Sequence, residues 1–394
     1  MILINILQVI PYYVPAYAFG GPLRVAQALS KRIVERGHRV VVATSNAASQ
    51  DEVLKDSERD LTIDGAKVYR FSVGSSKIQD VFGGFITPEL VKWMKENVAD
   101  FDVVHIHGYR NFQALVAGHY AVKQGVPYVL QPHGSLPRTG KAWSKRIYDS
   151  FQGLKVMRGA SLVLALNRKA ARAAVNFGVQ PDNVRILPNG IDISKYRSLP
   201  NKGSFRENYR IDQGESIILY VGRIHRNKGL DLLVRAFKTL PEDLFRSSTL
   251  VFAGPDDGYL SELRGMVSEL GMESRVHFLG YISEVEKMGA LVDSSAMVTP
   301  NFHGFPITFL ESCIAGCPIL TAKDDLDWID GKVGYVADAS IEDLRDKMAA
   351  LLGSEEESKK FEKACRNMKK RFSLDNVIGR LETLYDNAIC RNPS

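Results

Sequence analysis

The chain has 394 residues, a formal net charge of +6 and a hydrophobic content of 45%. These values match an average globular protein, so they exclude a disordered, fibrous or collagen-like chain. The length exceeds what one hydrophobic core ordinarily supports and suits two domains. The positive excess is small, and without a recognition motif it indicates a solvated surface and no nucleic-acid partner.

The first ten residues and the cysteines bear on location. Residues 1–10 are mostly apolar but lack a basic first region and a small-residue cleavage site, so they predict a buried strand rather than a signal peptide. No apolar run reaches 18 residues, the length that would predict a membrane span. The four cysteines lack zinc-type spacing and are interpreted as free thiols. We expect a cytoplasmic location.

The first half of the chain alternates strands with helices. A nearly continuous apolar strand comes first, and a loop with Gly20 and Gly21 leads into an amphipathic helix that stops at Gly37. Thr87-Pro88 predicts a helix start with Thr87 as its N-cap, and another helix is expected over 111–124. The expected strands cover residues 2–10, 39–44, 103–106, 128–131, 162–165 and 184–187.

A break rich in Asn, Gly, Ser, Pro and charge spans residues 188–213, after which the same rhythm restarts. The expected strands there cover residues 217–221, 250–253, 276–279, 296–299 and 318–321. Helices are expected over 341–352, 355–371 and 374–389. We predict an N-terminal Rossmann-like domain over 1–192, a C-terminal one over 193–373, and a last helix over 374–394 that packs back on the first domain.

Strand–helix repetition of this kind predicts the α/β class, with two doubly wound parallel sheets facing a central cleft. Ligands of such sheets bind at the carboxyl ends of the strands. The first candidate site is Val221-Gly222-Arg223-Ile224-His225-Arg226-Asn227-Lys228-Gly229, between a strand and a helix. The cations Arg223 and Lys228 beside a helix N-terminus favour anion binding. The alternative is a solvated basic loop.

The second candidate site runs from Pro300 to Pro318, again between a strand and a helix. Gly304 permits close backbone approach to a ligand, and the amides of Ile307 and Thr308 lie in the first helical turn, where they can meet a diphosphate. The Glu311 carboxylate lies about one turn further on and can accept hydrogen bonds from two ribose hydroxyls. The alternative is an ordinary helical glutamate.

Together these segments, "GR…KG" and "GFP…LESCIAGCP", resemble the retaining GT-B glycosyltransferases of family four. The likeness covers essentially the whole chain. Gly20-Gly21 is similar to the family's first glycine loop, and three further segments match in order: PHGSLP at 132–137, LPNGID at 187–192 and VHFLGYIS at 276–283.

The resemblance implies that Arg223 and Lys228 bind the donor diphosphate and stabilise the leaving nucleotide, with His133 near the donor sugar. Glu311 would hold the ribose, and the turn around Tyr281 would contact the base through its backbone. The implied donor-binding residues are Gly20, Gly21, Gly222, Tyr281, Ile282, His303, Gly304, Phe305, Pro306, Ile307, Thr308 and Glu311. No cofactor and no metal ion are implied.

The implied reaction is retaining transfer of a hexose from a nucleotide-diphosphate sugar, with a UDP-sugar favoured, to a glycan or lipid-linked acceptor in polysaccharide or glycoconjugate synthesis. The chain departs from the family pattern at His303, which stands where the first of two glutamates eight residues apart is usual. Imidazole can make one hydrogen bond but cannot act as a carboxylate. Pro306 replaces a common glycine and lacks an N–H group.

Two other features leave alternatives open. His105 and His107 share one face of a strand without a third metal ligand and suit packing or an acceptor-facing role. Residues 141–158 combine Trp143, Ile147 and Phe151 at four-residue spacing with several cations. This segment either docks its apolar stripe on the core or lies on the inner face of a membrane.

Two rival functions remain. No G-x-G-x-x-G follows a strand, which argues against a dehydrogenase. A sugar-nucleotide epimerase and a catalytically silent sugar-nucleotide-binding protein remain alternatives to a glycosyltransferase.

Overall fold

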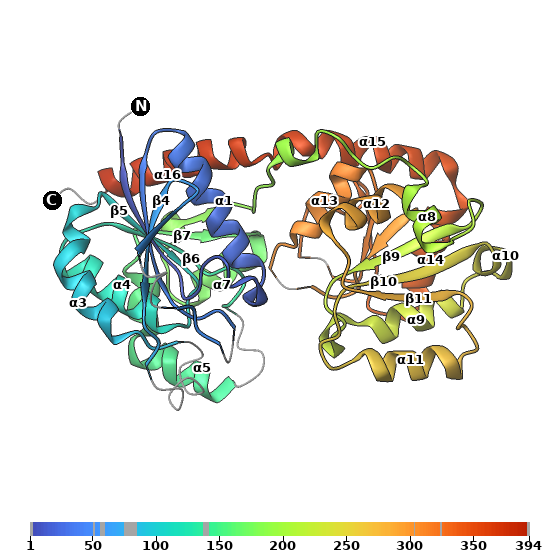
Figure 1. The fold of residues 1–394 in the computed structure, drawn as a ribbon, viewed down its shortest axis with the longest axis horizontal. Coiled ribbons are helices and arrows are strands. Elements are labelled where there is room, and N and C mark those ends of the chain that lie inside the picture. Colours follow the sequence, from blue (N-terminus) through green and yellow to red (C-terminus); the bar gives the residue numbers. More distant parts are fainter. Residues whose placement is uncertain are drawn as a thin grey trace. The chain divides into compact units, whose positions relative to one another are not determined.

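The computed structural model describes residues 3–49, 52–55, 60–74, 85–136, 142–302, 304–323 and 325–391. The chain divides into two compact units, one made of Met1–Gly190 with Leu374–Ser394 and one made of Ile191–Ser373. Each unit is a mostly parallel sheet with helices on both faces (Figure 1), which confirms the predicted fold class. The units are called the N-terminal unit and the C-terminal unit below.

Within the described residues, the sheet of the N-terminal unit has the strand order β3-β4-β2-β1-β5-β6-β7-β8. All neighbouring strands are parallel except β3, which runs antiparallel to β4. The strands are β1 (Asn5–Val9), β2 (Arg39–Ser45), β3 (Asp60–Ile63), β4 (Ala66–Phe71), β5 (Val103–His107), β6 (Tyr128–Gln131), β7 (Leu162–Ala165) and β8 (Val184–Ile186).

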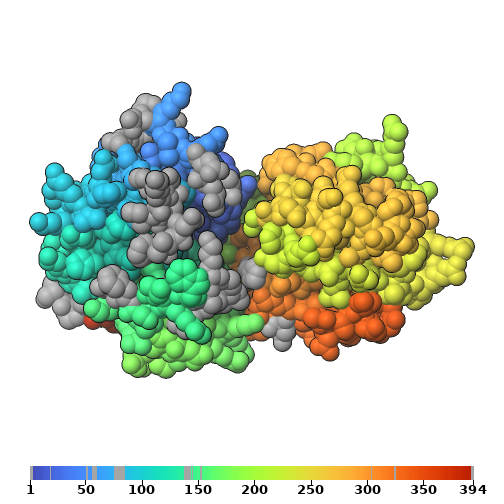
Figure 2. Space-filling model, turned by 90° about the horizontal axis from the view of Figure 1, so that it is seen from below, coloured from blue at the N-terminus to red at the C-terminus, as the bar shows by residue number. Residues whose placement is uncertain are grey.

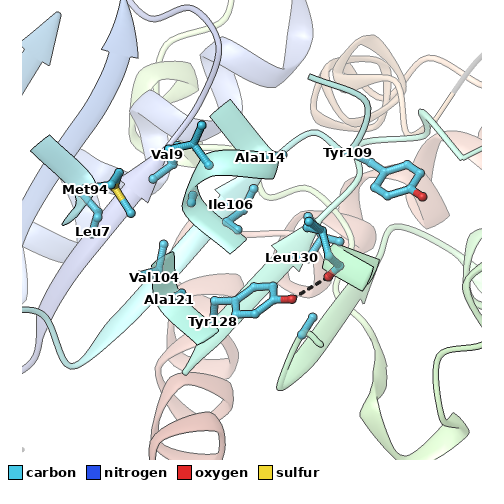
Figure 3. Close-up of a cluster of buried hydrophobic side chains, with 14 of the residues drawn as sticks. Leu7, Val9, Met94, Val104, Ile106, Tyr109, Ala114, Ala121, Tyr128 and Leu130 are labelled. Carbon is cyan, nitrogen blue, oxygen red and sulfur yellow. Dashed lines mark hydrogen bonds between the residues drawn. The ribbon is translucent and has the colours of Figure 1, made fainter. Parts of the chain in front are cut away.

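Helices cover both faces of this sheet. They are α1 (Gly21–Glu35), α3 (Pro88–Asn97), α4 (Phe112–Lys123), α5 (Ala142–Tyr148), α6 (Leu154–Arg158), α7 (Arg168–Asn176) and α16 (Leu374–Cys390). On one face, Met94 of α3 and Ala114 of α4 belong to one buried cluster with strand residues such as Leu7 and Ile106 (Figure 3). On the other, α1 and α16 lie side by side, and α16 contacts β5 and β6.

The C-terminal unit has, in the part of the chain that is described, a parallel sheet in the order β11-β10-β9-β12-β13-β14. Its strands are β9 (Ser216–Val221), β10 (Ser248–Ala253), β11 (Val276–Gly280), β12 (Ala296–Val298), β13 (Ile319–Thr321) and β14 (Gly334–Val336). Its helices are α8 (Ser204–Tyr209), α9 (Leu230–Lys238), α10 (Glu242–Arg246), α11 (Leu260–Glu269), α12 (Glu284–Asp293), α13 (Ile307–Ala315), α14 (Ile341–Gly353) and α15 (Glu355–Arg371). In Figure 1, α9 and α11 cover one face and α12 and α13 the other.

Three strands were missed, and two local predictions need correction. The strands β3, β4 and β14 were not predicted. Thr87 precedes α3 as expected, but its side chain makes no capping hydrogen bond, and its Oγ1 accepts from Gln113 Nε2 at 3.2 Å. The amphipathic segment 141–158, expected as one helix, is divided in its described part into α5, a π-helical turn over Asp149–Gly153, and α6.

Candidate functional site

Loops at the carboxyl edge of the C-terminal unit's sheet carry most of the predicted site residues. The loop after β9 is joined to the loop after β12, because Asn301 donates from its backbone N–H to the Lys228 carbonyl at 3.1 Å. The Asn301 side-chain amide also donates to the Asn227 carbonyl at 2.8 Å. The sheet order β9-β12 therefore unites the two segments that the sequence analysis singled out separately.

Three cations gather at this edge. Arg223 is exposed and pairs with the Asp257 carboxylate at 2.7 Å, whereas Lys228 is half-buried. The pKa of Lys228 is lowered, first by burial and then by repulsion from Arg223 and Lys323. Lys323 follows β13 and donates to the Phe302 carbonyl. A bound anion would relieve this repulsion. The sequence analysis missed Lys323, although its place just after a predicted strand was a usable signal.

The helix α13 begins beside these cations without a side-chain cap, since its N-cap residue is Pro306. The first-turn amides of Ile307 and Thr308 have no acceptor within the helix, as at any helix start. Gly304 has a φ of 71°, a conformation that favours glycine. The Phe305 ring packs instead against Trp328 and Phe372, with ring centroids 5.8 and 5.5 Å away, so only its backbone is available to a ligand.

Glu311 on α13 is buried and already has partners. Its Oε1 accepts from Lys287 Nζ at 2.8 Å and from the Tyr196 hydroxyl at 3.1 Å. Its Oε2 is buried, and no hydrogen-bond partner for it lies among the described residues. Burial lowers the pKa of Lys287, but Glu311 and Glu284 outweigh that effect and raise it. Oε2 is therefore the carboxylate oxygen without a partner in the described structure, and the contact of Glu311 with two ribose hydroxyls stays a prediction.

The ends of β9, β10 and β11 pack closely beside this site. A Cβ atom on Gly254 would lie 1.9 Å from the Gly222 carbonyl oxygen, so glycine is required there. The Gly254 N–H donates to the Gly280 carbonyl at 2.7 Å, and the turn with Tyr281 and Ile282 follows. Tyr281 is 77% exposed, and the contact of this turn with a base stays a prediction.

The remaining predicted site residues lie in the N-terminal unit. Gly20 has a φ of 88° and precedes α1, and the space beside Gly20 and Gly21 is open for 4 Å around an added Cβ atom. His133 follows β6 with a φ of 51°, and its Nε2 lies 2.9 Å from Nδ1 of His107. The sequence analysis found no third group beside His105 and His107, but the structure places His133 there. Within the described residues, no set of His, Cys, Asp or Glu side chains is arranged to hold a metal ion.

Some predicted features lie outside the described residues or differ from expectation. His303, Lys141 and residue 137 of the PHGSLP segment are not described. On α5, Trp143 and Ile147 are 65% and 53% exposed, so docking of these two side chains on the core is wrong. The segment around α5 lies at the surface, green in Figure 2. Among the helices of the described chain, none has the length and apolar content to cross a membrane.

Comparison with known families agrees with this arrangement. Residues 20–190 match the family model described as "Glycosyl transferase 4-like domain", and residues 201–368 match "Glycosyl transferases group 1". The two matches lie in the two units and together span most of the chain. The chain belongs to the group 1 glycosyltransferases and has their two-domain GT-B fold, as its sequence motifs predicted.

Similar proteins include the lipopolysaccharide glucosyltransferase WaaG of Escherichia coli, 24% identical over 82% of this chain and 81% of that protein. An uncharacterized glycosyltransferase of Methanocaldococcus jannaschii is 26% identical over 78% of each chain. Among solved structures, Anabaena HepE in complex with UDP and glucose superposes with a TM-score of 0.76 at 18% identity, covering 97% of this chain and 100% of that one. At this identity the structural likeness establishes the fold alone.

Proposed function

We propose that this glycosyltransferase transfers a hexose from a nucleotide-diphosphate sugar, with a UDP-sugar as favoured donor, without a metal ion and with retention at the anomeric carbon. The observation that carries the proposal is the junction of Arg223, Lys228 and the uncapped start of α13 on one edge of the C-terminal unit's sheet. This edge offers positive charge and N–H donors together, the chemistry that a diphosphate requires.

The proposed mechanism uses this edge to stabilise the leaving group. As the bond from the anomeric carbon to the phosphate oxygen breaks, negative charge grows on the diphosphate. Arg223, Lys228 and the amides of Ile307 and Thr308 oppose that charge, and each charge-assisted contact contributes about 1.5–3 kcal/mol. The acceptor hydroxyl then attacks from the face that the leaving group vacates, while a phosphate oxygen takes its proton. His133 contacts the donor sugar, and Glu311 Oε2 accepts from the ribose.

The names of relatives support the donor and acceptor classes. HepE was solved with UDP and glucose and with UDP-glucose, and WaaG is named for glucosyl transfer to lipopolysaccharide. Other relatives are named as D-inositol 3-phosphate glycosyltransferases. We therefore propose a hydroxyl of a glycan or lipid-linked molecule as the acceptor.

We further propose that the enzyme works at the cytoplasmic face of a membrane and binds it peripherally. The exposed Trp143 and Ile147 on α5 stand beside Lys145 and Arg146, which suits an anionic lipid surface.

Incubation of the purified chain with a panel of nucleotide sugars tests the reaction. Release of nucleoside diphosphate with transfer or slow hydrolysis is expected, and the anomeric configuration of the product reports retention. Interconversion of the sugar would identify an epimerase instead, and binding without turnover a silent binding protein.

Substitution of the cations tests their role. Lys228→Ala and Arg223→Ala are each expected to lower transfer by about 100-fold, the effect of losing one preorganised transition-state contact. Arg226→Ala is a matched control from the same loop, since Arg226 is exposed and pairs with Glu262. A near-normal rate for Lys228→Ala or Arg223→Ala would refute the diphosphate assignment.

A further inference from the structure

Three imidazoles lie in a row at the carboxyl ends of β5 and β6. The rings of His105 and His107 stack with centroids 4.1 Å apart, and those of His107 and His133 stack at 5.2 Å. His107 Nδ1 is 2.9 Å from His133 Nε2, within hydrogen-bonding distance. At the other end of the row, His105 Nδ1 is 2.7 Å from the Tyr385 hydroxyl on α16. The proposed function uses only His133 of this row.

Protonation in the row follows from burial and from hydrogen-bond partners. Burial lowers the pKa of His105 to about 3 and that of His133 to about 4, and it holds the pKa of His107 well below its ordinary value. All three rings are therefore neutral at pH 7. A hydrogen bond between two neutral imidazoles requires one nitrogen to donate and the other to accept.

The second nitrogen of His107 decides which ring donates. His107 Nε2 is buried, and none of the described residues offers it a hydrogen-bond partner. A buried N–H group without an acceptor is rarer in proteins than a buried acceptor without a donor. The proton of His107 is therefore placed on Nδ1, where it has an acceptor in His133 Nε2.

We infer that His107 is a positioning residue, whose Nδ1–H donates to His133 Nε2 and fixes His133 in the tautomer that carries its proton on Nδ1. His133 is only partly buried, so its ring remains accessible to a ligand. It then presents a neutral N–H donor, which suits a sugar hydroxyl or a phosphate oxygen. That choice of ligand rests on the proposed function, whereas the tautomer does not.

The loop that carries His133 is also held by Arg110, which is not one of the three histidines. Arg110 donates to the carbonyls of Ser135 and Leu136, the second at 3.0 Å. The same guanidinium pairs with the buried Asp149 carboxylate at 3.0 Å. The backbone around His133 is therefore held independently of His107, so His107 contributes ring orientation and tautomer.

Nuclear magnetic resonance of the full chain with ¹⁵N-labelled histidine tests the tautomer directly. The chain has eight histidines, so few signals compete, and His133→Gln assigns the pair of interest. A protonated Nδ1 and an unprotonated Nε2 on His133 are expected at pH 7. A proton on Nε2 would overturn the inference. This measurement needs no variant at His107 and no catalytic turnover.

Two variants then separate positioning from packing. His107→Phe keeps an aromatic ring but removes the donor, and it is expected to move the His133 proton to Nε2 and to lower turnover about tenfold, the effect of one neutral hydrogen bond. Affinity for the free nucleoside diphosphate is expected to stay unchanged. Tyr385→Phe is the matched control, since it removes a buried hydrogen bond from the same row and should leave both readouts of His133 unaltered.

Turnover of the His133 and His107 variants distinguishes failure of this inference from failure of the proposed function. If His133→Ala lowers transfer and a folded His107→Phe does not, the inference fails. If His133→Ala also leaves transfer unchanged, the role proposed for His133 in the reaction fails, while the resonance data still decide the tautomer.

Discussion

Arg223 and Glu311, both proposed to bind the donor, already pair with other side chains of the C-terminal unit. When the donor binds, each of these pairs must either break or persist beside the ligand. Arg223 pairs with Asp257 on the surface, where an ion pair contributes about 0–1 kcal/mol. Exchanging this carboxylate for a diphosphate therefore costs little. Glu311 is different, because its pairing with Lys287 is almost fully buried. That pair is expected to persist when the ribose binds to Oε2.

Glu311→Gln is expected to weaken binding of free nucleoside diphosphate by about tenfold or more, because it removes a charged acceptor and leaves Lys287 without its buried partner. Isothermal titration without any sugar measures the effect. Glu284→Gln is the matched control, since Glu284 pairs with the same lysine at 2.7 Å but is largely exposed. Equal affinity of Glu311→Gln and the parent protein would show that Glu311 is only a structural helix residue.

The histidine row predicts a loss of stability in acid. The folded-state pKa values of His105 and His133, about 3 and about 4, lie below the ordinary value of 6.5. Between pH 6.5 and about 4 the unfolded chain binds protons that the folded chain does not. The free energy of unfolding therefore decreases as the pH is lowered through this range. Each pH unit crossed removes up to about 1.4 kcal/mol per histidine.

Urea unfolding from pH 7 to pH 5, followed in the N-terminal unit, checks this prediction. His105→Gln should reduce the slope, whereas His119→Gln, at an exposed position on α4, should keep it. A free energy of unfolding that is independent of pH over this range would contradict the predicted protonation states.

At the scale of elements, sequence predicted best the strands that are buried on both faces. Residues 128–131 and 162–165 were placed with the bounds that the structure has, because continuous apolar runs require a covered parallel sheet. Strand β3 was missed because its residues are partly or fully exposed, so its pattern resembles a loop. In β14 (Gly334–Val336) only the glycine is fully buried, so β14 lacks the apolar run that marks the equally short strands β12 and β13.

The candidate site was predictable only where its residues lie within recognisable sequence segments. Arg223, Lys228 and Glu311 were named because each follows a strand within a recognisable segment. Lys287 and Tyr196 were missed because they come from other elements, whereas Lys323 was missed although it directly follows a predicted strand. Their approach to the site depends on the strand order and on the packing of α12 and α13, which local patterns do not encode.

Helix α5 shows the same limit. The four-residue spacing of Trp143 and Ile147 predicted a helix, but spacing cannot say whether an apolar stripe faces a core or solvent. In the structure both side chains are exposed. Two apolar side chains with Lys145 and Arg146 between them are expected to bind the surface of an anionic bilayer.

Flotation with vesicles that contain an anionic lipid tests this expectation. The protein should float at low salt and less at high salt, because about 1 kcal/mol per basic residue is available near the surface and salt screens it. Trp143→Asp with Ile147→Asp should abolish flotation, whereas Val122→Asp, at an equally exposed position on α4, should not. Absence of flotation at low salt would remove the membrane proposal without affecting the donor site.

At the scale of the whole molecule, helix α16 belongs to the N-terminal unit although it follows the C-terminal unit in the sequence. Helix α15 belongs to the C-terminal unit, and α16, only three residues later, belongs to the N-terminal unit. One face of α16 is buried there, including Leu381 and Tyr385. Glu382 on the same helix contacts Arg36 and His38 at 2.8 and 3.2 Å. The stability of the N-terminal unit therefore depends on a helix that follows the whole of the C-terminal unit in the sequence.

Leu381→Ala tests this dependence, because truncating a fully buried leucine costs about 2–5 kcal/mol. Hydrogen exchange followed by mass spectrometry should show faster exchange in peptides that cover β5 and β6, which α16 contacts. Peptides from β9 and β10 should exchange as in the parent protein, since they lie in the other unit. Thr383→Ala is the matched control, at an exposed position on the same helix. Faster exchange confined to residues 355–371 would instead mean that α16 stabilises its neighbour in sequence and not the N-terminal sheet.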